Sequence, residues 1–188
     1  MIMSMLESNV IAVTSRKLCS RPLEEQIERI AQKGVKKVIL REKDLNESEY
    51  LLLAERVQEK CFGCNLELII HSFSNVAHSL GINRLHMPLD KLTEDLSGEF
   101  AILGTSIHSL EQLEKALSLG VSYVIAGHIF ETDCKMGVPP RGLEFLKEIC
   151  AASSAPVYAI GGINEENLNL VIEAGAVGGC MMSKMMKI

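Results

Sequence analysis

The stretch from Gly127 to Lys135 brings together side chains with which this sequence could do chemistry. It follows the apolar run Tyr123–Ala126, which is typical of a buried strand, and it contains His128, Thr132 and Lys135. A group that transfers protons near neutral pH, a hydroxyl and a fixed cation together suit acid–base chemistry on an anionic substrate. An ordinary solvated loop would contain the same residue types, so the rest of the chain must decide.

Apolar runs alternate with amphipathic segments along the chain. The runs that predict strands are Val10–Thr14, Lys37–Arg41, Leu66–His71, Arg84–Met87, Phe100–Thr105, Tyr123–Ala126, Val157–Ile160 and Gly178–Met182. The segments that predict helices are Pro22–Lys33, Ser48–Lys60, Asn75–Leu80, Ser109–Leu119, Gly142–Ala151 and Asn164–Ala174. Strands without polar alternation are typical of parallel sheets buried on both faces. The pattern therefore predicts an α/β protein.

Eight strands alternating with helices predict a closed (β/α)8 TIM barrel. The alternative, an open flavodoxin-like sheet, would use fewer strands. We expect one compact barrel domain over residues 1–188, with a short fourth helix and a shortened C-terminal helix.

Composition narrows the class of function. The chain has 188 residues, of which 47% are hydrophobic and 23% charged, as in an ordinary globular domain. A net charge of -5 and the lack of a basic run argue against a nucleic-acid partner. No apolar run approaches the roughly 20 residues of a membrane span, and no signal sequence is evident. We expect a cytoplasmic protein that does not bind membranes.

In a barrel of this kind, function lies at the C-terminal ends of the strands. Gly161 and Gly162 follow the seventh predicted strand and precede a predicted helix, and Ser183 follows the eighth. Glycines let backbone N–H groups approach an anion, and a helix N-terminus adds positive charge. These residues predict a phosphate site, although a tight turn would explain the glycine pair equally well.

Other strand ends supply further polar groups. Arg41 and Lys43 lie at the end of the second predicted strand and would face an anion from one side of an extended segment, unless they are simply a solvated charge run. Ser106 follows the fifth strand, where capping of the next helix is the alternative role. The histidines show neither helical pairing nor a Cys/His cluster, so we predict no tightly bound metal.

Taken together, these segments resemble the thiamine phosphate synthase superfamily, most closely its thiazole tautomerase branch, over nearly the whole chain. The resemblance is carried by Val13–Thr14, Arg41–Lys43, Gly104–Ser109, Gly127–Lys135, Arg141–Gly142, Ala159–Ile163 and Met182–Ser183. It implies the TIM barrel fold and a thiamine precursor as the small-molecule partner.

Departures from the synthase pattern distinguish the two branches. The synthase joins a pyrimidine diphosphate to a thiazole phosphate with Mg²⁺, and it carries Asn-Asp where this chain has His71-Ser72. A second metal acid is displaced or lost near Asp90, and His128 stands where the synthase usually has Pro. With two carboxylates missing, the resemblance favours the tautomerase.

As a tautomerase, the enzyme would be a cofactor-free isomerase that aromatises a thiazole carboxylate phosphate. The resemblance implies that His128 is its acid–base residue, and it implies substrate or phosphate contacts from Arg41, Lys43, Ser106, Thr132, Lys135, Gly161, Gly162 and Ser183. Two alternatives stay open: an Mg²⁺-dependent thiamine phosphate synthase, which is a transferase, and a non-catalytic regulatory protein that binds a thiazole or thiamine phosphate. We expect a homo-oligomer in each case.

Overall fold

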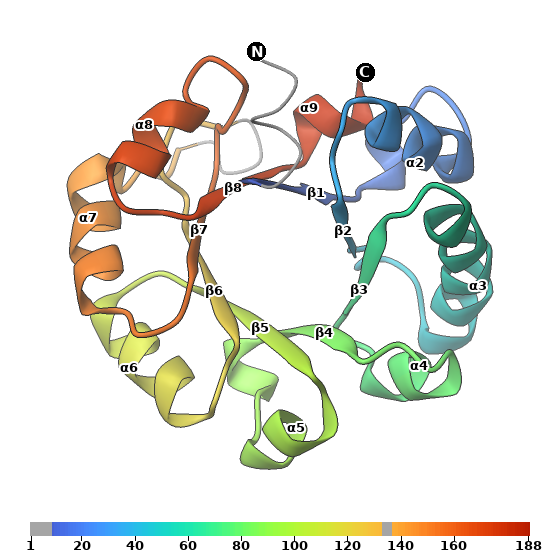
Figure 1. Ribbon diagram of the computed structural model, residues 1–188, viewed down its shortest axis with the longest axis horizontal. Coiled ribbons are helices and arrows are strands. Elements are labelled where there is room, and N and C mark those ends of the chain that lie inside the picture. The colour runs from blue at the N-terminus through green and yellow to red at the C-terminus, as the bar shows by residue number, and fades with distance from the viewer. Residues whose placement is uncertain (1–8, 133–136) are drawn as a thin grey trace. The chain divides into compact units, whose positions relative to one another are not determined.

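The computed structural model describes residues 9–132 and 137–188. Strands β1 to β8 form a closed barrel in chain order, and helices alternate with the strands (Figure 1), so the predicted (β/α)8 barrel is confirmed. The chain divides into two compact units, residues 1–86 with 182–188 and residues 87–181. The assignment of residues 1–188 to a single domain stays a prediction.

The first unit contains the N-terminal strands and the helices that cover them. Its elements are β1 (Val10–Val13), η1 (Arg16–Leu18), α2 (Leu23–Gln32), β2 (Lys37–Leu40), α3 (Glu47–Gly63), β3 (Glu67–His71), α4 (Ser74–Ser79), most of β4 (Arg84–Pro88), and α9 (Ser183–Met186). Strand β2 pairs in parallel with β1 and β3, and β3 also pairs with β4. Helices α2, α3 and α4 lie outside these strands (Figure 1).

Helix α3 shows how the sequence builds this unit. The Asn46 side chain accepts from the Glu49 amide, and the Glu49 carboxylate accepts from the Asn46 amide, which together form a capping box. Tyr50, one residue further on, is fully buried. Its hydroxyl donates to the Leu40 carbonyl at 2.5 Å and accepts from the His71 amide at 3.1 Å. Tyr50 therefore ties α3 to the C-terminal ends of β2 and β3.

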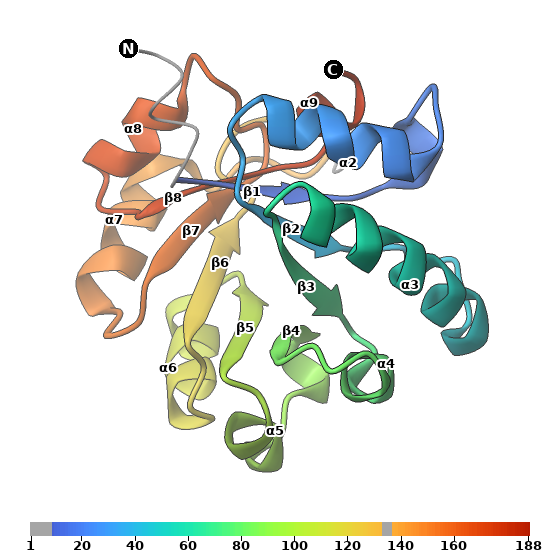
Figure 2. The same cartoon turned by 45° about the vertical axis from the view of Figure 1, so that its right-hand side comes forward.

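The second unit repeats the strand–helix alternation. Its elements are η2 (Leu89–Lys91), α5 (Glu94–Glu99), β5 (Ile102–Ile107), α6 (Leu110–Ser118), β6 (Tyr123–Gly127), α7 (Gly142–Ala152), β7 (Val157–Ile160), α8 (Leu168–Glu173) and β8 (Gly178–Met181). Strands β5 to β8 pair in parallel in that order, with α6 beside β5 and β6 (Figure 2).

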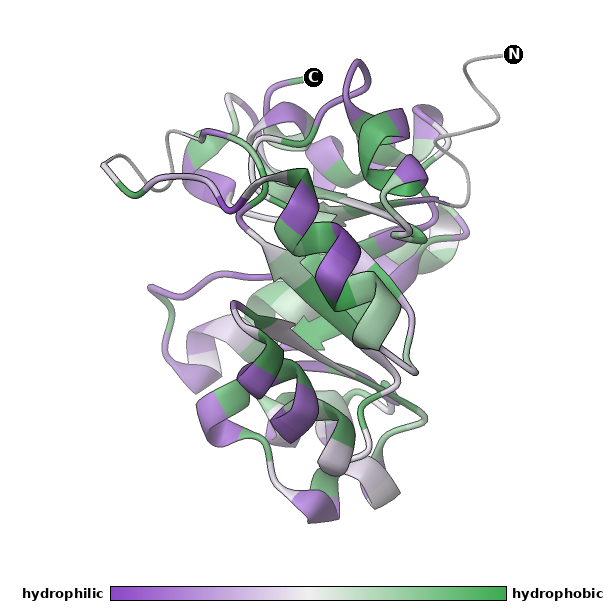
Figure 3. Ribbon diagram, turned by 90° about the vertical axis from the view of Figure 1, so that its left-hand side faces the viewer, coloured by the Kyte–Doolittle hydropathy of each residue, from purple (hydrophilic) through white to green (hydrophobic). Residues whose placement is uncertain are grey.

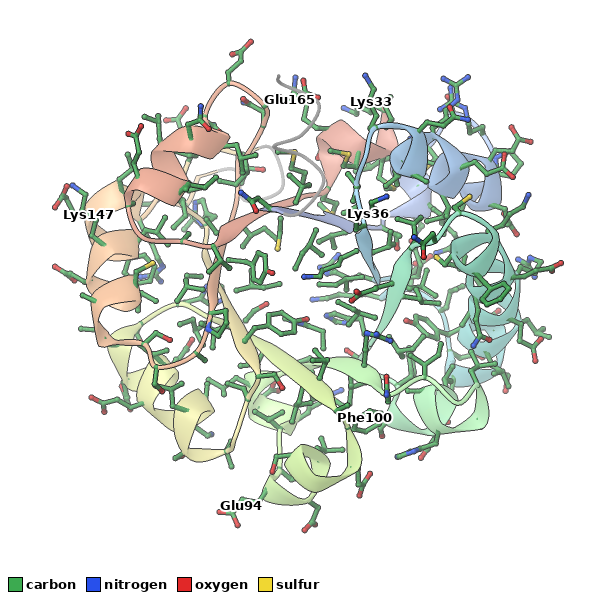
Figure 4. All side chains as sticks on the ribbon, in the orientation of Figure 1. Lys33, Lys36, Glu94, Phe100, Lys147 and Glu165 are labelled. Atoms are coloured by element: carbon green, nitrogen blue, oxygen red, sulfur yellow. The ribbon has the colours of Figure 1, made fainter. Side chains whose placement is uncertain are left out.

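Hydrophobic and hydrophilic residues are distributed in the same way in both units. The strands are mostly hydrophobic, whereas the helices carry hydrophobic and hydrophilic residues on different faces (Figure 3). Glu94 on α5 and Lys147 on α7 point away from the strands of their unit (Figure 4). Within the described ranges, no helix is both long and apolar enough to cross a membrane.

Two element boundaries differ from the sequence expectation in ways that affect the site. Strand β5 runs from Ile102 to Ile107, later than the predicted Phe100–Thr105, because Ser106 and Ile107 continue the pairing with β6. Helix α8 begins at Leu168 rather than Asn164. The Asn164 side chain accepts from the Glu166 amide at 2.8 Å, which forms a local turn that delays the helix.

Removing the Tyr50 hydroxyl should destabilise the protein. Tyr50→Phe leaves a buried carbonyl and a buried amide without this partner, and we expect the free energy of unfolding to fall by about 1–3 kcal/mol. Urea denaturation measures the change. Leu52→Ala, on the exposed face of the same helix, is the control and should have little effect. Equal losses in the two variants would contradict the bridging role of Tyr50.

Candidate active site

The Arg-Glu-Lys segment after β2 is organised around Glu42, whose side chain is buried. Its carboxylate accepts from the Thr14 hydroxyl at 2.8 Å, from the Arg16 amide at 2.9 Å and from the Arg16 guanidinium at 2.9 Å. Only 4% of Glu42 is exposed. A buried carboxylate is tolerated when it is paired and hydrogen-bonded. Glu42 therefore joins the chain after β1 to the chain after β2.

Thr14 connects the Glu42 carboxylate to the backbone of Arg41. The Thr14 hydroxyl, which donates to Glu42, also accepts from the Arg41 amide at 2.9 Å. The Thr14 amide donates to the Ile39 carbonyl at 3.0 Å, which continues the ladder between β1 and β2. Arg41 is thus held at a defined position where β2 ends, as the sequence predicted.

Lys43 differs from Arg41 in its local backbone. The sequence predicts one extended segment from Arg41 to Lys43, but a turn begins at Lys43. The Leu45 amide closes that turn on the Glu42 carbonyl at 3.4 Å. Strand alternation therefore does not place the exposed Lys43 side chain together with Arg41, and its contact with substrate stays a prediction.

His71 and His86 lie side by side on two adjacent strands, and Arg41 directly follows the neighbouring strand β2. His71 and His86 are register partners, and Arg41 follows Leu40, the register partner of Ile70. The two imidazole rings stack with centroids 5.6 Å apart and planes 20° apart. The sequence assigns neither histidine to the site, because the pair becomes evident only once the register of β3 and β4 is known.

Burial keeps His86 neutral. Only 2% of the residue is exposed, and this desolvation, with smaller contributions from His71 and Arg41, lowers the pKa of His86 to about 3. At the protein surface nearby, hydrogen bonds from Arg16 lower the pKa of the Asp44 carboxyl, with Lys17 adding to the effect. Arg16 binds both Asp44 oxygens at 2.7 Å.

In the second unit, the glycines after β7 pack against the chain that follows β6. The Ile129 amide donates to the Ile160 carbonyl at 2.9 Å, and the Phe130 amide donates to the Gly161 carbonyl at 3.0 Å. A Cβ on Gly161 would lie 2.2 Å from the Cβ of His128, and one on Gly162 would lie 2.4 Å from a backbone oxygen. This close approach accounts for the glycine pair, and its phosphate role stays a prediction.

His128 is buried and uses a ring nitrogen for an internal contact. Its Nε2 lies 3.2 Å from the Val138 carbonyl, which can only accept, so Nε2 carries the proton in this bond. The neighbouring Gly127 carbonyl accepts in the same way from His108 Nδ1 at 2.6 Å. These bonds anchor the segment after β6.

The remaining predicted site residues fall in several places. Ser106 lies within β5, level with Ile125 of β6, rather than at the strand end. Thr132 is half-buried at the edge of the described chain, and Lys135 lies outside the described residues. Ser183 is the first residue of α9 in the first unit. Contacts from these residues to a substrate stay predictions.

The family of the chain follows from sequence comparison. A family model described as thiamine monophosphate synthase matches residues 10–185. The chain belongs to this family. It is 33% identical over 180 residues to a thiamine-phosphate synthase of Syntrophomonas wolfei, covering 93% of this chain and 86% of the relative. It is 35% identical over 187 residues to the thiamine-phosphate synthase of Clostridium acetobutylicum, covering 96% and 88%.

A solved structure supports the fold. The thiamine phosphate pyrophosphorylase from Pyrococcus furiosus matches with a TM-score of 0.83 and 24% identity, over 96% of this chain and 89% of that one. The relatives named above are enzymes of group transfer, and this finding contradicts the thiazole tautomerase predicted from His128. The departures at His71-Ser72, near Asp90 and at His128 were too little evidence for an isomerase, and the internal bond of the His128 ring gives that residue a structural role.

The carboxylates that follow Arg41 do not fit Mg²⁺, which the synthase resemblance implies. Mg²⁺ prefers carboxylate oxygens in octahedral geometry. In the first unit, both Glu42 oxygens bind Arg16, and Asp44 binds Arg16 and Lys17. Among the described residues, no group of three or more His, Cys, Asp or Glu side chains could hold a metal ion. No step of the reaction is therefore assigned to Mg²⁺.

The neutral His86 should make stability depend on acid pH. Its pKa falls from 6.5 to about 3 on folding, so between these values the unfolded chain binds the extra proton. We expect this residue to reduce the free energy of unfolding as pH falls through that window, with a slope of up to about 1.4 kcal/mol per pH unit. Denaturation at pH 7, 6 and 5 tests this, since His86→Gln should have a shallower slope than the wild type. Parallel slopes would contradict it.

Proposed function

We propose that this protein is a thiamine-phosphate synthase, which joins a hydroxymethylpyrimidine diphosphate to a thiazole phosphate. The observation that carries the proposal is the agreement of relatives with this name over almost the full length of both chains. In this reaction the thiazole nitrogen bonds to the pyrimidine methylene carbon. The carbon–oxygen bond to diphosphate breaks, and its electron pair leaves with the diphosphate.

The charge that develops on the leaving diphosphate needs a fixed cation. Arg41 meets this need, because its guanidinium is permanently charged and forms paired hydrogen bonds with phosphate oxygens. Thr14 and Glu42 hold the Arg41 backbone before substrate arrives, which reduces the reorganisation required during the reaction. We assign Arg41 to the diphosphate on these grounds.

The thiazole phosphate is assigned to groups predicted from the sequence. Gly161, Gly162 and Ser183 are proposed for its phosphate, with hydrogen bonds from Ser106 and Thr132. The cytoplasmic location and the homo-oligomeric state stay predictions.

The test is the coupling reaction itself. Purified protein is mixed with both precursors, in separate reactions with Mg²⁺ and with EDTA, and thiamine phosphate is quantified by chromatography. We expect product well above the reaction without protein. Arg41→Gln should lower kcat/KM by roughly 10²–10³, the usual effect of removing a group that stabilises transition-state charge.

Arg29→Gln is the matched control, because Arg29 is exposed on α2 and should leave the rate unchanged. No product under either metal condition would contradict the proposal. If both precursors bind and are not joined, the protein is instead a binding protein for thiamine precursors, which is the non-catalytic alternative.

A further inference from the structure

We propose that the C-terminal ends of β2 and β3, supported by β4, form a site that binds diphosphate without a divalent cation, through Arg41 and His71. The proposal rests on the proposed function for the identity of the anion. It goes further by stating how this chain neutralises an anion that usually arrives with a metal ion.

The arrangement of side chains gives the first argument. Arg41 directly follows β2, His71 is the last residue of the neighbouring strand β3, and His86 stacks against His71 from the next strand. A guanidinium and an imidazole both offer N–H donors, and donors of this kind bind phosphate oxygens directly. Mg²⁺ instead prefers carboxylate oxygens, which neither side chain supplies.

The second argument is that the carboxylates of Glu42 and Asp44 are already held by other side chains. Glu42 is held on its own side of the chain by Thr14 and Arg16, where it is 4% exposed. Asp44 is held by Arg16 and Lys17 at the surface. A divalent cation placed beside Arg41 would therefore meet a like charge, and neither of these two carboxylates would offset the repulsion.

The position of the His71 ring gives the third argument. Ser72 Oγ lies 2.7 Å from His71 Nδ1, and the Ser72 amide donates to the His86 carbonyl at 3.0 Å. Ser72 adopts a φ of 71°, a conformation that is costly for serine and persists where surrounding contacts impose it. The Tyr50 hydroxyl accepts from the His71 amide at 3.1 Å, and the His86 ring stacks on the His71 ring. The ring is thus oriented before any ligand binds.

The experiment is a calorimetric titration of the full chain with inorganic diphosphate, in excess EDTA and again in Mg²⁺. We expect binding in EDTA at an affinity equal to or tighter than in Mg²⁺. Arg41→Gln should weaken binding in EDTA by roughly tenfold or more, since a charge-assisted pair is lost. Absence of binding in EDTA, or a tenfold gain on adding Mg²⁺, would overturn the proposal.

A second variant tests the role of His71 directly. His71→Asp replaces a donor by a carboxylate, so binding in EDTA should fall roughly tenfold and Mg²⁺ should now increase the affinity. His78→Asp adds the same charge on the exposed part of α4 and is the control, expected to behave as the wild type. Identical behaviour of the two variants would count against His71, and the wild-type titration decides the metal question even if His71→Asp fails to fold.

The proposed function and this inference fail separately. If the protein binds diphosphate without a metal ion but does not join the two precursors, the site is supported and the synthase function is contradicted. Coupling that occurs only with Mg²⁺, together with diphosphate binding only in Mg²⁺, supports the synthase and overturns the site.

Discussion

The buried carboxylate of Glu42 is the interaction on which the organisation of the first unit's strand ends depends. Leaving such a group unpaired would cost several kcal/mol, so the chain after β1 must supply Thr14 and Arg16 to it. The same Thr14 hydroxyl holds the Arg41 amide. The hydrogen bonds of Glu42 therefore fix the chain after β1 and the chain after β2, and through Thr14 they position Arg41. The same bonds occupy the Glu42 carboxylate, so that it does not bind a metal ion.

The fold could be predicted from the sequence because its signals are local. Apolar runs without polar alternation mark β1 to β3 and β6, and the amphipathic pattern of α2 puts Ile27 and Ile30 in the core. The errors arose where tertiary pairing or side-chain chemistry overrides the pattern. Pairing with β6 extends β5 to Ile107, and the turn at Asn164 delays α8.

The site could be predicted only in part. Arg41 was assigned to the site because a cation at a strand end has a chemical meaning wherever the chain goes next, and its contact with substrate stays a prediction. The stacked histidines could not be found, since residues that are 15 positions apart meet only through the register of β3 and β4. The tautomerase function predicted with His128 as its acid–base residue is contradicted by the names of the relatives, and the contact of this ring with the Val138 carbonyl is invisible in the sequence.

Hydrogen exchange at the Arg41 amide tests most directly whether Glu42 organises the strand ends. The account predicts that Glu42→Gln, measured by NMR under native conditions, increases exchange of this amide more than tenfold relative to the wild type. Amides in the centre of α2, such as Ile27, should change only as far as global stability changes. Exchange at Arg41 that matches the wild type would contradict the account, because the carboxylate would then not be what holds the cation in place.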